Sequence, residues 1–386
     1  MSIPPELKPL IAEARRQYPQ LAALPDQTVA RMILQAMQQQ GAWPPASEQG
    51  PEKMSADELV KIGEQLLATG RWDEAERHLL RAVEQAEQAH DGRLQTWATL
   101  RLGGLCTERG NFAQAMTLHQ QALALAEQLG DRHLMGTIYN GMGENYRRQG
   151  GYPQATECYR KSLAIMEQLG DEQGLSAVYG NLGSVYQQQG EIERAIQSFK
   201  KCLEYSLKTG ADQQDAALAY NNLGIVYKNQ GRYDLAIEMY QKSLPIKLRL
   251  GDQQGAANTY ANLGNVHREL GDPQQAIPMY QKALEIMQRI GDEPGMAQDY
   301  GNLANAYNLL GDVGRALEHY HKALNIFERI GDRHNSAIVY FNLGQFCREQ
   351  GNVTQARAYY EKAKALYEMM GDARYAQLAA QALRRL

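Results

Sequence analysis

Glycine recurs at a fixed spacing through most of the 386 residues, and this period constrains the fold more than any other feature of the sequence. One series repeats every 40 residues, with a single step of 41: Gly70, Gly110, Gly150, Gly190, Gly231, Gly271, Gly311 and Gly351. A period of about 20 to 50 residues indicates stacked units, because one unit is too small to bury its own apolar surface. We therefore expect eight tandem repeats.

Each repeat has the pattern of two amphipathic helices. In residues 174–189, apolar or aromatic side chains and one glycine fall on a single helical face, at Tyr179, Leu182, Gly183 and Tyr186. Gly190 predicts the end of that helix, because glycine adopts the left-handed conformation at low cost. The next helix repeats the spacing, at Ala195, Phe199 and Leu203.

Two further series of small residues predict where the helices of a repeat cross. Seven positions before each turn glycine stands Gly63, Gly103, Gly143, Gly183, Gly224, Gly264, Ala304 or Gly344. Five positions after it stands Ala75, Ala115, Ala155, Ala195, Ala236, Ala276, Ala316 or Ala356. Side chains this small allow two backbones to approach closely, so we expect an all-α stack.

The repeats divide the chain into three parts. Residues 51–372 hold the eight repeats, and 373–386 fit a C-terminal capping helix with Leu378 and Leu383 facing inward. Residues 1–50 lack the repeat positions and are expected to form a short helical appendage followed by a proline-rich linker.

The repeated motif resembles the tetratricopeptide repeat over residues 55–371: an aromatic residue, Leu-Gly and Tyr in the first helix, then Ala and an aromatic residue in the second. The 40-residue period and the run Asn262-Leu263-Gly264-Asn265 are most similar to the longer repeats of the Pins type, in the Leu-Gly-Asn-repeat proteins. The resemblance implies a right-handed superhelical solenoid that binds an extended peptide along its inner surface.

Composition excludes several other functions. The formal charge is −4, and basic and acidic residues are interspersed, so no basic stripe for nucleic acid is predicted. No apolar run approaches the roughly 18 residues of a membrane span, and no secretory signal is visible at the start, so a cytoplasmic protein is expected. The four cysteines form no CxxC pair and are expected to be buried thiols: Cys106, Cys158, Cys202 and Cys347.

No catalytic or cofactor-binding motif is found. The sequence has no GxxxxGK[ST], HExxH or GxSxG pattern, nor a GxGxxG after a strand. His319 and His321 lie two residues apart on one predicted helix, so they point to different faces and make a poor metal site. We expect no enzymatic activity, no cofactor and no bound metal.

A column of asparagines marks the candidate binding surface. The residue before Leu-Gly (Leu-Ala in the seventh repeat) is asparagine in five successive repeats: Asn181, Asn222, Asn262, Asn302 and Asn342. Asparagine is a poor helix former, so packing gives no reason for it to recur at one helical position. Its amide can both donate to and accept from a peptide backbone. An alternative role, fixing the stacking of neighbouring repeats, remains open.

Two further columns follow on the same predicted face. Three residues after the ladder stand Ser184, Ile225, Asn265, Asn305 and Gln345. Three residues further on are the basic side chains Arg147, Lys228, Arg268 and Arg348, which would favour an acidic peptide or lie solvated at a helix end. The candidate peptide-binding set is Asn181, Asn222, Asn262, Asn265, Asn302, Asn305, Asn342, Arg147, Lys228, Arg268 and Arg348.

Related chaperone adaptors grip the C-terminus of a partner with a lysine just before the ladder asparagine. This chain instead has Gly180, Asn221, Ala261, Gly301 and Phe341 there, which argues against that mode. We therefore expect an adaptor or scaffold for a protein or peptide ligand. A peptide-sensing regulator and a self-assembling structural subunit remain as alternatives, and the sequence leaves the oligomeric state open.

Overall fold

A computed structural model describes residues 54–210 and 213–386, and these residues form 17 helices and no strand. Residues 1–50, for which a separate appendage is predicted, lie outside the described part. The all-α prediction is confirmed for the described part of the chain.

The helices alternate as the first and second members of eight repeats. The first helices are α3 (Ala56–Ala68), α5 (Gly92–Glu108), α7 (Arg132–Arg148), α9 (Glu172–Gln188), α11 (Gln213–Asn229), α13 (Gln253–Glu269), α15 (Glu293–Leu310) and α17 (Arg333–Glu349). The second helices are α4 (Trp72–Gln88), α6 (Phe112–Leu129), α8 (Tyr152–Leu169), α10 (Ile192–Thr209), α12 (Tyr233–Leu250), α14 (Pro273–Ile290), α16 (Val313–Ile330) and α18 (Val353–Met369). A final helix, α19 (Ala373–Arg384), follows them.

The chain divides into two compact units within α5, with residues up to Ala98 in the first and Thr99–Leu386 in the second. In the first unit, α3 packs on α4, and Leu59, Val60 and Ala82 are buried together. Ser55 and Glu58 begin α3 with a reciprocal capping box, which satisfies two backbone N–H groups at the helix start.

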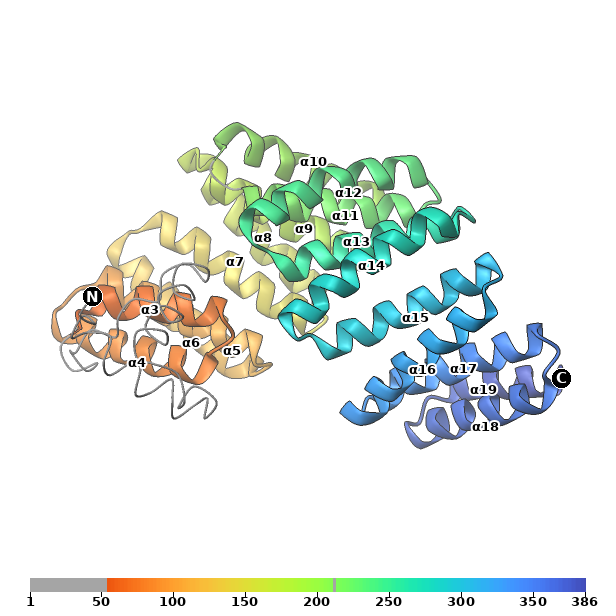
Figure 1. The fold of residues 1–386 in the computed structure, drawn as a ribbon. Helices are drawn as coiled ribbons and strands as arrows, with labels where there is room; N and C mark the ends of the chain where they lie inside the picture. The colour runs from red at the N-terminus through yellow and green to blue at the C-terminus, as the bar shows by residue number, and fades with distance from the viewer. Residues whose placement is uncertain (1–53, 211–212) are drawn as a thin grey trace, which may run out of the picture. The chain divides into compact units, whose positions relative to one another are not determined.

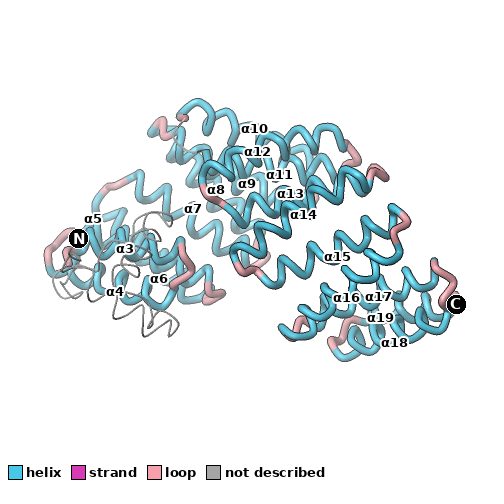
Figure 2. Tube along the Cα trace, viewed as in Figure 1, coloured by secondary structure: helices cyan, strands magenta, loops and turns pink. Residues whose placement is uncertain are grey.

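In the second unit, each helix from α6 onward packs against the next one along the chain, as expected for a helical solenoid (Figures 1 and 2). First helices of neighbouring repeats also contact each other, in the pairs α7–α9, α9–α11, α11–α13 and α13–α15. The first helices from α7 to α15 therefore contact one another in succession.

The left-handed glycine conformation predicted for the turns within repeats is confirmed, as at Gly190 with φ of 77°, and the turns between repeats use it as well. Gly130 ends α6 with φ of 66°, a left-handed conformation that a side chain would strain. Asp131 then caps α7, because its side chain accepts a hydrogen bond from the Leu134 N–H at 3.0 Å. The turns are short for this reason, and each new helix starts at a fixed position.

The first and second helices of a repeat cross where a glycine faces an aromatic ring. At Gly264 an added Cβ would lie 2.6 Å from the ring of Tyr280, so the close approach requires the absence of a side chain. The same contact joins Gly143 to Tyr159 and Gly224 to Tyr240. The rings of Tyr159, Tyr240 and Tyr280 are fully buried, so the predicted crossing of small residues is confirmed.

The repeated alanines and the cysteines are buried as predicted. All eight alanines of the series have no exposed surface: Ala75, Ala115, Ala155, Ala195, Ala236, Ala276, Ala316 and Ala356. The four cysteines are buried free thiols. In α19, however, the prediction that Leu378 faces inward is wrong. The buried face carries Ala376, Ala379 and Ala382, and Leu378 lies two residues from Ala376, which on a helix is the opposite side.

The first two repeats depart from the aromatic pattern, with Leu79 facing Gly63 in the first and His119 in the second. His119 stands where later repeats have a tyrosine or phenylalanine, and it contacts Gly103 in the same way. Its imidazole is buried, and neither ring nitrogen has a hydrogen-bond partner among the described residues. Burial lowers the pKa of His119 to about 4, since it disfavours the charged form.

Ala276→Leu should lower the free energy of unfolding by about 1–3 kcal/mol, because the larger side chain overpacks a fully buried helix crossing. Urea denaturation monitored by circular dichroism measures this change. An unchanged midpoint would show that the crossing is not tightly packed at Ala276.

His119→Phe should raise the free energy of unfolding by about 1–3 kcal/mol at neutral pH, because it removes buried nitrogens without partners. The folded-state pKa of His119 lies below its ordinary value of 6.5. The wild type should therefore lose stability relative to the variant as the pH falls from about 6.5 to about 4. Urea denaturation across this range tests the prediction, and a constant difference between the two proteins would contradict it.

Candidate peptide-binding surface of the first helices

The five ladder asparagines lie at equivalent positions on α9, α11, α13, α15 and α17, and each is partly exposed. In each of these helices a tyrosine stands two residues before the ladder asparagine: Tyr179, Tyr220, Tyr260, Tyr300 and Tyr340. Two residues on an α-helix are about 200° apart, so the ladder and these tyrosines point to opposite sides. The side chains of Asn222, Asn262 and Asn342 have no hydrogen-bond partner in the described part of the chain.

Two ladder asparagines have neighbours within the protein. The amide of Asn181 donates to Asn140 Oδ1 at 3.0 Å, a bond from α9 to α7 in the preceding repeat. Asn302 lies beside Asp299 one turn earlier, and its hydrogen bonding acts against the rise in the pKa of that carboxyl. At Asn181 the side chain therefore links neighbouring repeats.

The next column is tied to the core. Asn265 Oδ1 accepts a hydrogen bond from the buried Tyr280 hydroxyl at 2.8 Å, and Asn305 Oδ1 accepts one from Tyr320 at 2.5 Å. Glu144 occupies the same position in α7 and accepts from Tyr159 at 3.3 Å. In Asn265 and Asn305 the side-chain oxygen thus accepts from a tyrosine of the same repeat, and this bond does not use the side-chain N–H groups.

The four basic residues differ in their partners. Arg147 forms an ion pair with Glu144 at 2.6 Å, and Lys228 lies 3.5 Å from Glu269. Arg268 and Arg348 have no acidic partner in the described part of the chain. Arg268 lies beside the Tyr280 hydroxyl, and its Nε is buried without a hydrogen-bond partner in the residues described.

The structure reveals a buried polar cluster beside the ladder that sequence reasoning missed. Lys247 of α12 is buried and donates to Thr259 Oγ1 at 2.9 Å, to the Gly255 carbonyl at 3.1 Å and to Asn221 Oδ1 at 3.4 Å. Burial lowers the pKa of Lys247. The sequence does carry a signal for this cluster, because Lys247 is charged where the equivalent residues of other repeats are uncharged: Ala126, Met166, Ser206, Met287, Phe327 and Tyr367.

Asp299 is a second buried polar residue missed from the sequence. It takes the position of Ile138, Val178, Ala219, Thr259 and Val339 in other repeats. Only 2% of its surface is exposed, and Oδ2 has no hydrogen-bond partner among the described residues. Burial raises the pKa of Asp299 to about 7, and the nearby Asp292 adds to the rise.

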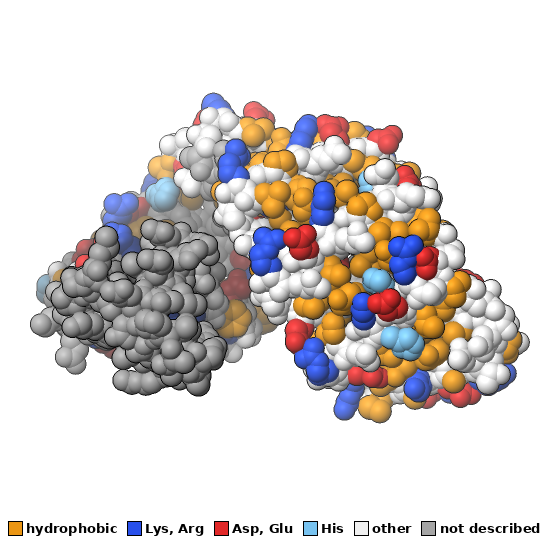
Figure 3. Space-filling model, in the orientation of Figure 1, with side chains coloured by type: hydrophobic (Ala, Val, Ile, Leu, Met, Phe, Trp, Pro, Cys, Tyr) orange, Lys and Arg blue, Asp and Glu red, His pale blue; other side chains and the backbone are white. Residues whose placement is uncertain are grey.

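Neither a metal site nor a membrane span is found among the described residues. They contain no group of three or more His, Cys, Asp or Glu side chains that could hold a metal ion. None of the described helices is long and apolar enough to cross a membrane. On the face of the second unit seen in Figure 3, basic and acidic side chains are interspersed with hydrophobic ones.

Asp299→Asn should flatten one part of the pH dependence of stability. The folded-state pKa lies above the ordinary 3.8, so unfolding releases a proton between about pH 4 and 7 and becomes easier as the pH rises. The free energy of unfolding of the variant should exceed that of the wild type by at least about 1 kcal/mol at pH 7, and the two should be equal near pH 4. Urea denaturation at several pH values checks this, and parallel pH profiles would rule it out.

Comparison with solved structures gives the same fold. A signal-transduction ATPase with numerous domains and a tetratricopeptide-repeat sensor, from Pyrococcus horikoshii, is 16% identical with a TM-score of 0.68, and the match covers 98% of this chain and 55% of that one. RapI in its apo form is 14% identical, with a TM-score of 0.64 and coverage of 86% and 96%. The apo quorum sensor NprR from B. thuringiensis is 14% identical, with a TM-score of 0.56 and coverage of 94% and 96%.

Among curated proteins, no significant match was found. A family model described as "Tetratricopeptide repeat" matches residues 56–128, 134–208, 215–289 and 296–369. Each match spans two of the helix pairs, and together they cover more than half of the sequence. The chain therefore belongs to the tetratricopeptide-repeat family.

Proposed function

We propose that this protein is a non-enzymatic, cytoplasmic adaptor that binds an extended peptide, or an extended segment of another protein, along its first helices. The observation that carries the proposal is the ladder, in which asparagine occupies one position in five consecutive first helices. Three of these asparagines, Asn222, Asn262 and Asn342, have carboxamides without partners in the described residues. Because these three side chains form no hydrogen bond within the described residues, stabilising the fold does not account for asparagine at their positions.

The ladder suits a peptide backbone. A carboxamide presents one acceptor and two donors, which match the N–H and C=O groups of an extended chain. Asn222 and Asn262 lie on adjacent first helices, which contact each other. Asn265 adds a further donor one turn along, because Tyr280 occupies only its carbonyl oxygen. Backbone recognition of this kind binds a segment with little regard to its side chains.

The charges on this surface favour one kind of ligand over others. Arg147 and Lys228 are neutralised by acidic neighbours, so they add little attraction for a ligand. Arg268 has no acidic neighbour at ion-pair distance in the described part of the chain, so no ion pair neutralises its charge. An acidic side chain of the peptide placed near Arg268 would form a charge-assisted hydrogen bond. The ligand is therefore proposed to carry an acidic residue at this point.

A second candidate is a regulator that changes conformation when it binds a peptide. Its support is that the fold matches nearly the full length of NprR, a quorum sensor. Small-angle scattering with and without a bound peptide separates the two functions. A change in radius of gyration on binding favours the regulator, and an unchanged value favours the adaptor.

The test begins with peptides selected from a displayed random library on the full chain, with affinities measured by fluorescence anisotropy. Replacing Asn222 and Asn262 together by Ala should weaken binding by about 5- to 150-fold, since each bond contributes about 0.5–1.5 kcal/mol. Arg268→Gln should weaken acidic peptides more than neutral ones.

Asn325→Ala is the matched control, because Asn325 is an exposed asparagine on a second helix, α16. It should bind like the wild type. The ladder variant should also keep the wild-type melting temperature. Normal binding by a ladder variant would contradict the proposal, as would weakened binding that only follows a loss of stability.

A further inference from the structure

Six repeats present the same groove on the other side of the first helices. Each groove has a first helix at its base and second helices on both sides, and a lysine lies over a tyrosine ring within it. The pairs are Lys161–Tyr139, Lys201–Tyr179, Lys242–Tyr220, Lys282–Tyr260, Lys322–Tyr300 and Lys362–Tyr340. The chain therefore provides internal references against which each groove can be compared.

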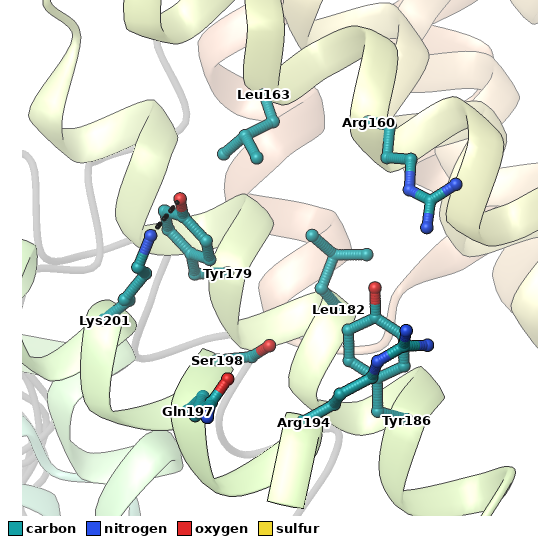
Figure 4. Close-up of a pocket in the computed structure, with 9 residues that line it drawn as sticks. All are labelled: Arg160, Leu163, Tyr179, Leu182, Tyr186, Arg194, Gln197, Ser198 and Lys201. Carbon is teal, nitrogen blue, oxygen red and sulfur yellow. Dashed lines mark hydrogen bonds between the residues drawn. The ribbon is translucent and has the colours of Figure 1, made fainter. Parts of the chain in front are cut away.

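The groove formed by α8, α9 and α10 contains a cavity of about 290 Å³ (Figure 4). The groove of Tyr340 and Lys362 also contains a cavity, of about 610 Å³, nearer the start of α17. The cavity at Tyr179 is distinguished by Ser198 in its lining. The equivalent residues in the other five grooves are larger: Cys158, Met239, Met279, His319 and Tyr359. Ser198 lies between Tyr179 and Tyr186, and its hydroxyl has no partner among the described residues.

The groove three repeats later shows what fits this space. There the imidazole ring of His319 lies 5.8 Å from the ring of Tyr300 and 5.2 Å from that of Tyr307. Tyr300 and Tyr307 are the equivalents of Tyr179 and Tyr186. A flat ring therefore occupies the space that Ser198 leaves empty, and the cavity is shaped for a ring supplied by a ligand.

The open groove also carries more positive charge than its equivalents. Arg160, Arg194 and Lys201 line the cavity, with Lys201 facing the two arginines across it in Figure 4. Arg160 has no acidic partner in the described part of the chain, whereas Arg194 pairs with Glu191 at 2.5 Å. Lys201 donates to the Tyr179 hydroxyl at 3.0 Å.

The other grooves lack this combination. Gln197, one turn before Lys201, is replaced by Glu238 and Glu318, which pair with Lys242 at 2.6 Å and Lys322 at 2.5 Å. The residue equivalent to Arg160 is Lys200, Gln241, Gln281 or His321 in the four grooves that follow. The position of Arg194 holds Leu235 in the next groove.

We propose that this cavity binds an aryl phosphate, presented as a phosphorylated tyrosine side chain of a partner protein. The rings of Tyr179 and Tyr186, with Leu163 and Leu182, form the aromatic and apolar wall for the ring. The arginines supply forked donors for the phosphate oxygens. Two arginines and one lysine, with Glu191 paired to Arg194 and Glu167 acting on Lys201, leave a positive site that suits a doubly charged phosphate better than a singly charged carboxylate.

The site lies apart from the ladder, because Tyr179 and Asn181 point to opposite sides of α9. Titration calorimetry with phenyl phosphate, on the full chain, tests it. Ser198→Met should weaken binding by at least about tenfold by filling the cavity, as Met239 and Met279 do. Gln197→Glu and Arg160→Gln should each weaken it by about ten- to a hundredfold through the loss of favourable charge.

Three controls distinguish the outcomes. Ser198→Cys leaves most of the cavity open and should still bind phenyl phosphate. Replacing Asn222 and Asn262 together by Ala should leave the affinity for phenyl phosphate unchanged. Met239→Ser opens the next groove, where Leu235 and Glu238 replace Arg194 and Gln197, and should create no second site. Thermal melting verifies that Ser198→Met is folded.

Three results would overturn the proposal: no heat of binding with phenyl phosphate, equal binding by folded Ser198→Met, or equal affinity for benzoate. The last would assign the cavity to carboxylates. Loss of binding in the ladder variant alone would place the phosphate on the other face and would also overturn it.

Discussion

The structure depends on the close contact between a small residue in each first helix, a glycine in all repeats but the seventh, and a side chain of the second helix that is a ring in all repeats but the first. At Gly143 and Gly224 even one added carbon would lie 2.5 Å from a tyrosine ring, so the two backbones approach as closely as the ring allows. That contact sets the spacing and register of the two helices in a repeat. Because it recurs in successive repeats, equivalent residues emerge in columns. The asparagine ladder and the row of tyrosine–lysine grooves both result from this regularity.

Much of this fold was predictable because its determinants are local. The turn glycines, the caps such as Asp131 and the small residues at crossings act within one repeat and recur through the sequence. The roles of Asn265 and Asn305 were not predictable in the same way, since they depend on how far the Tyr280 and Tyr320 hydroxyls reach. In hindsight this column follows a rule. An acceptor stands there in the repeats of Tyr159, Tyr280 and Tyr320, whereas in the repeat of Phe199, which has no hydroxyl, Ser184 donates to the Gly180 carbonyl instead.

The repeat of Tyr240 is an exception to this rule, and there a buried hydroxyl is left without a hydrogen bond. Ile225 occupies the position of Asn265 in the repeat of Tyr240, and the Tyr240 hydroxyl is buried without a partner in the described part. Burial also raises the pKa of that phenol. The candidate sites follow from such departures: Ser198 in place of a larger residue, and Asp299 and Lys247 in place of uncharged ones. Family membership defines the framework, and individual substitutions within repeats give each groove its own chemistry.

The bond from Asn181 to Asn140 spans 41 residues, about one repeat, and it is among the longest sequence separations joined by a side-chain hydrogen bond in the described residues. A chain whose contacts are this local has a low contact order, so little entropy is lost in closing loops before native contacts form. During synthesis, a repeat can complete most of its contacts once the following helix has left the ribosome, long before the C-terminus exists. Folding of the second unit can therefore proceed in the order of translation, with α19 docking last.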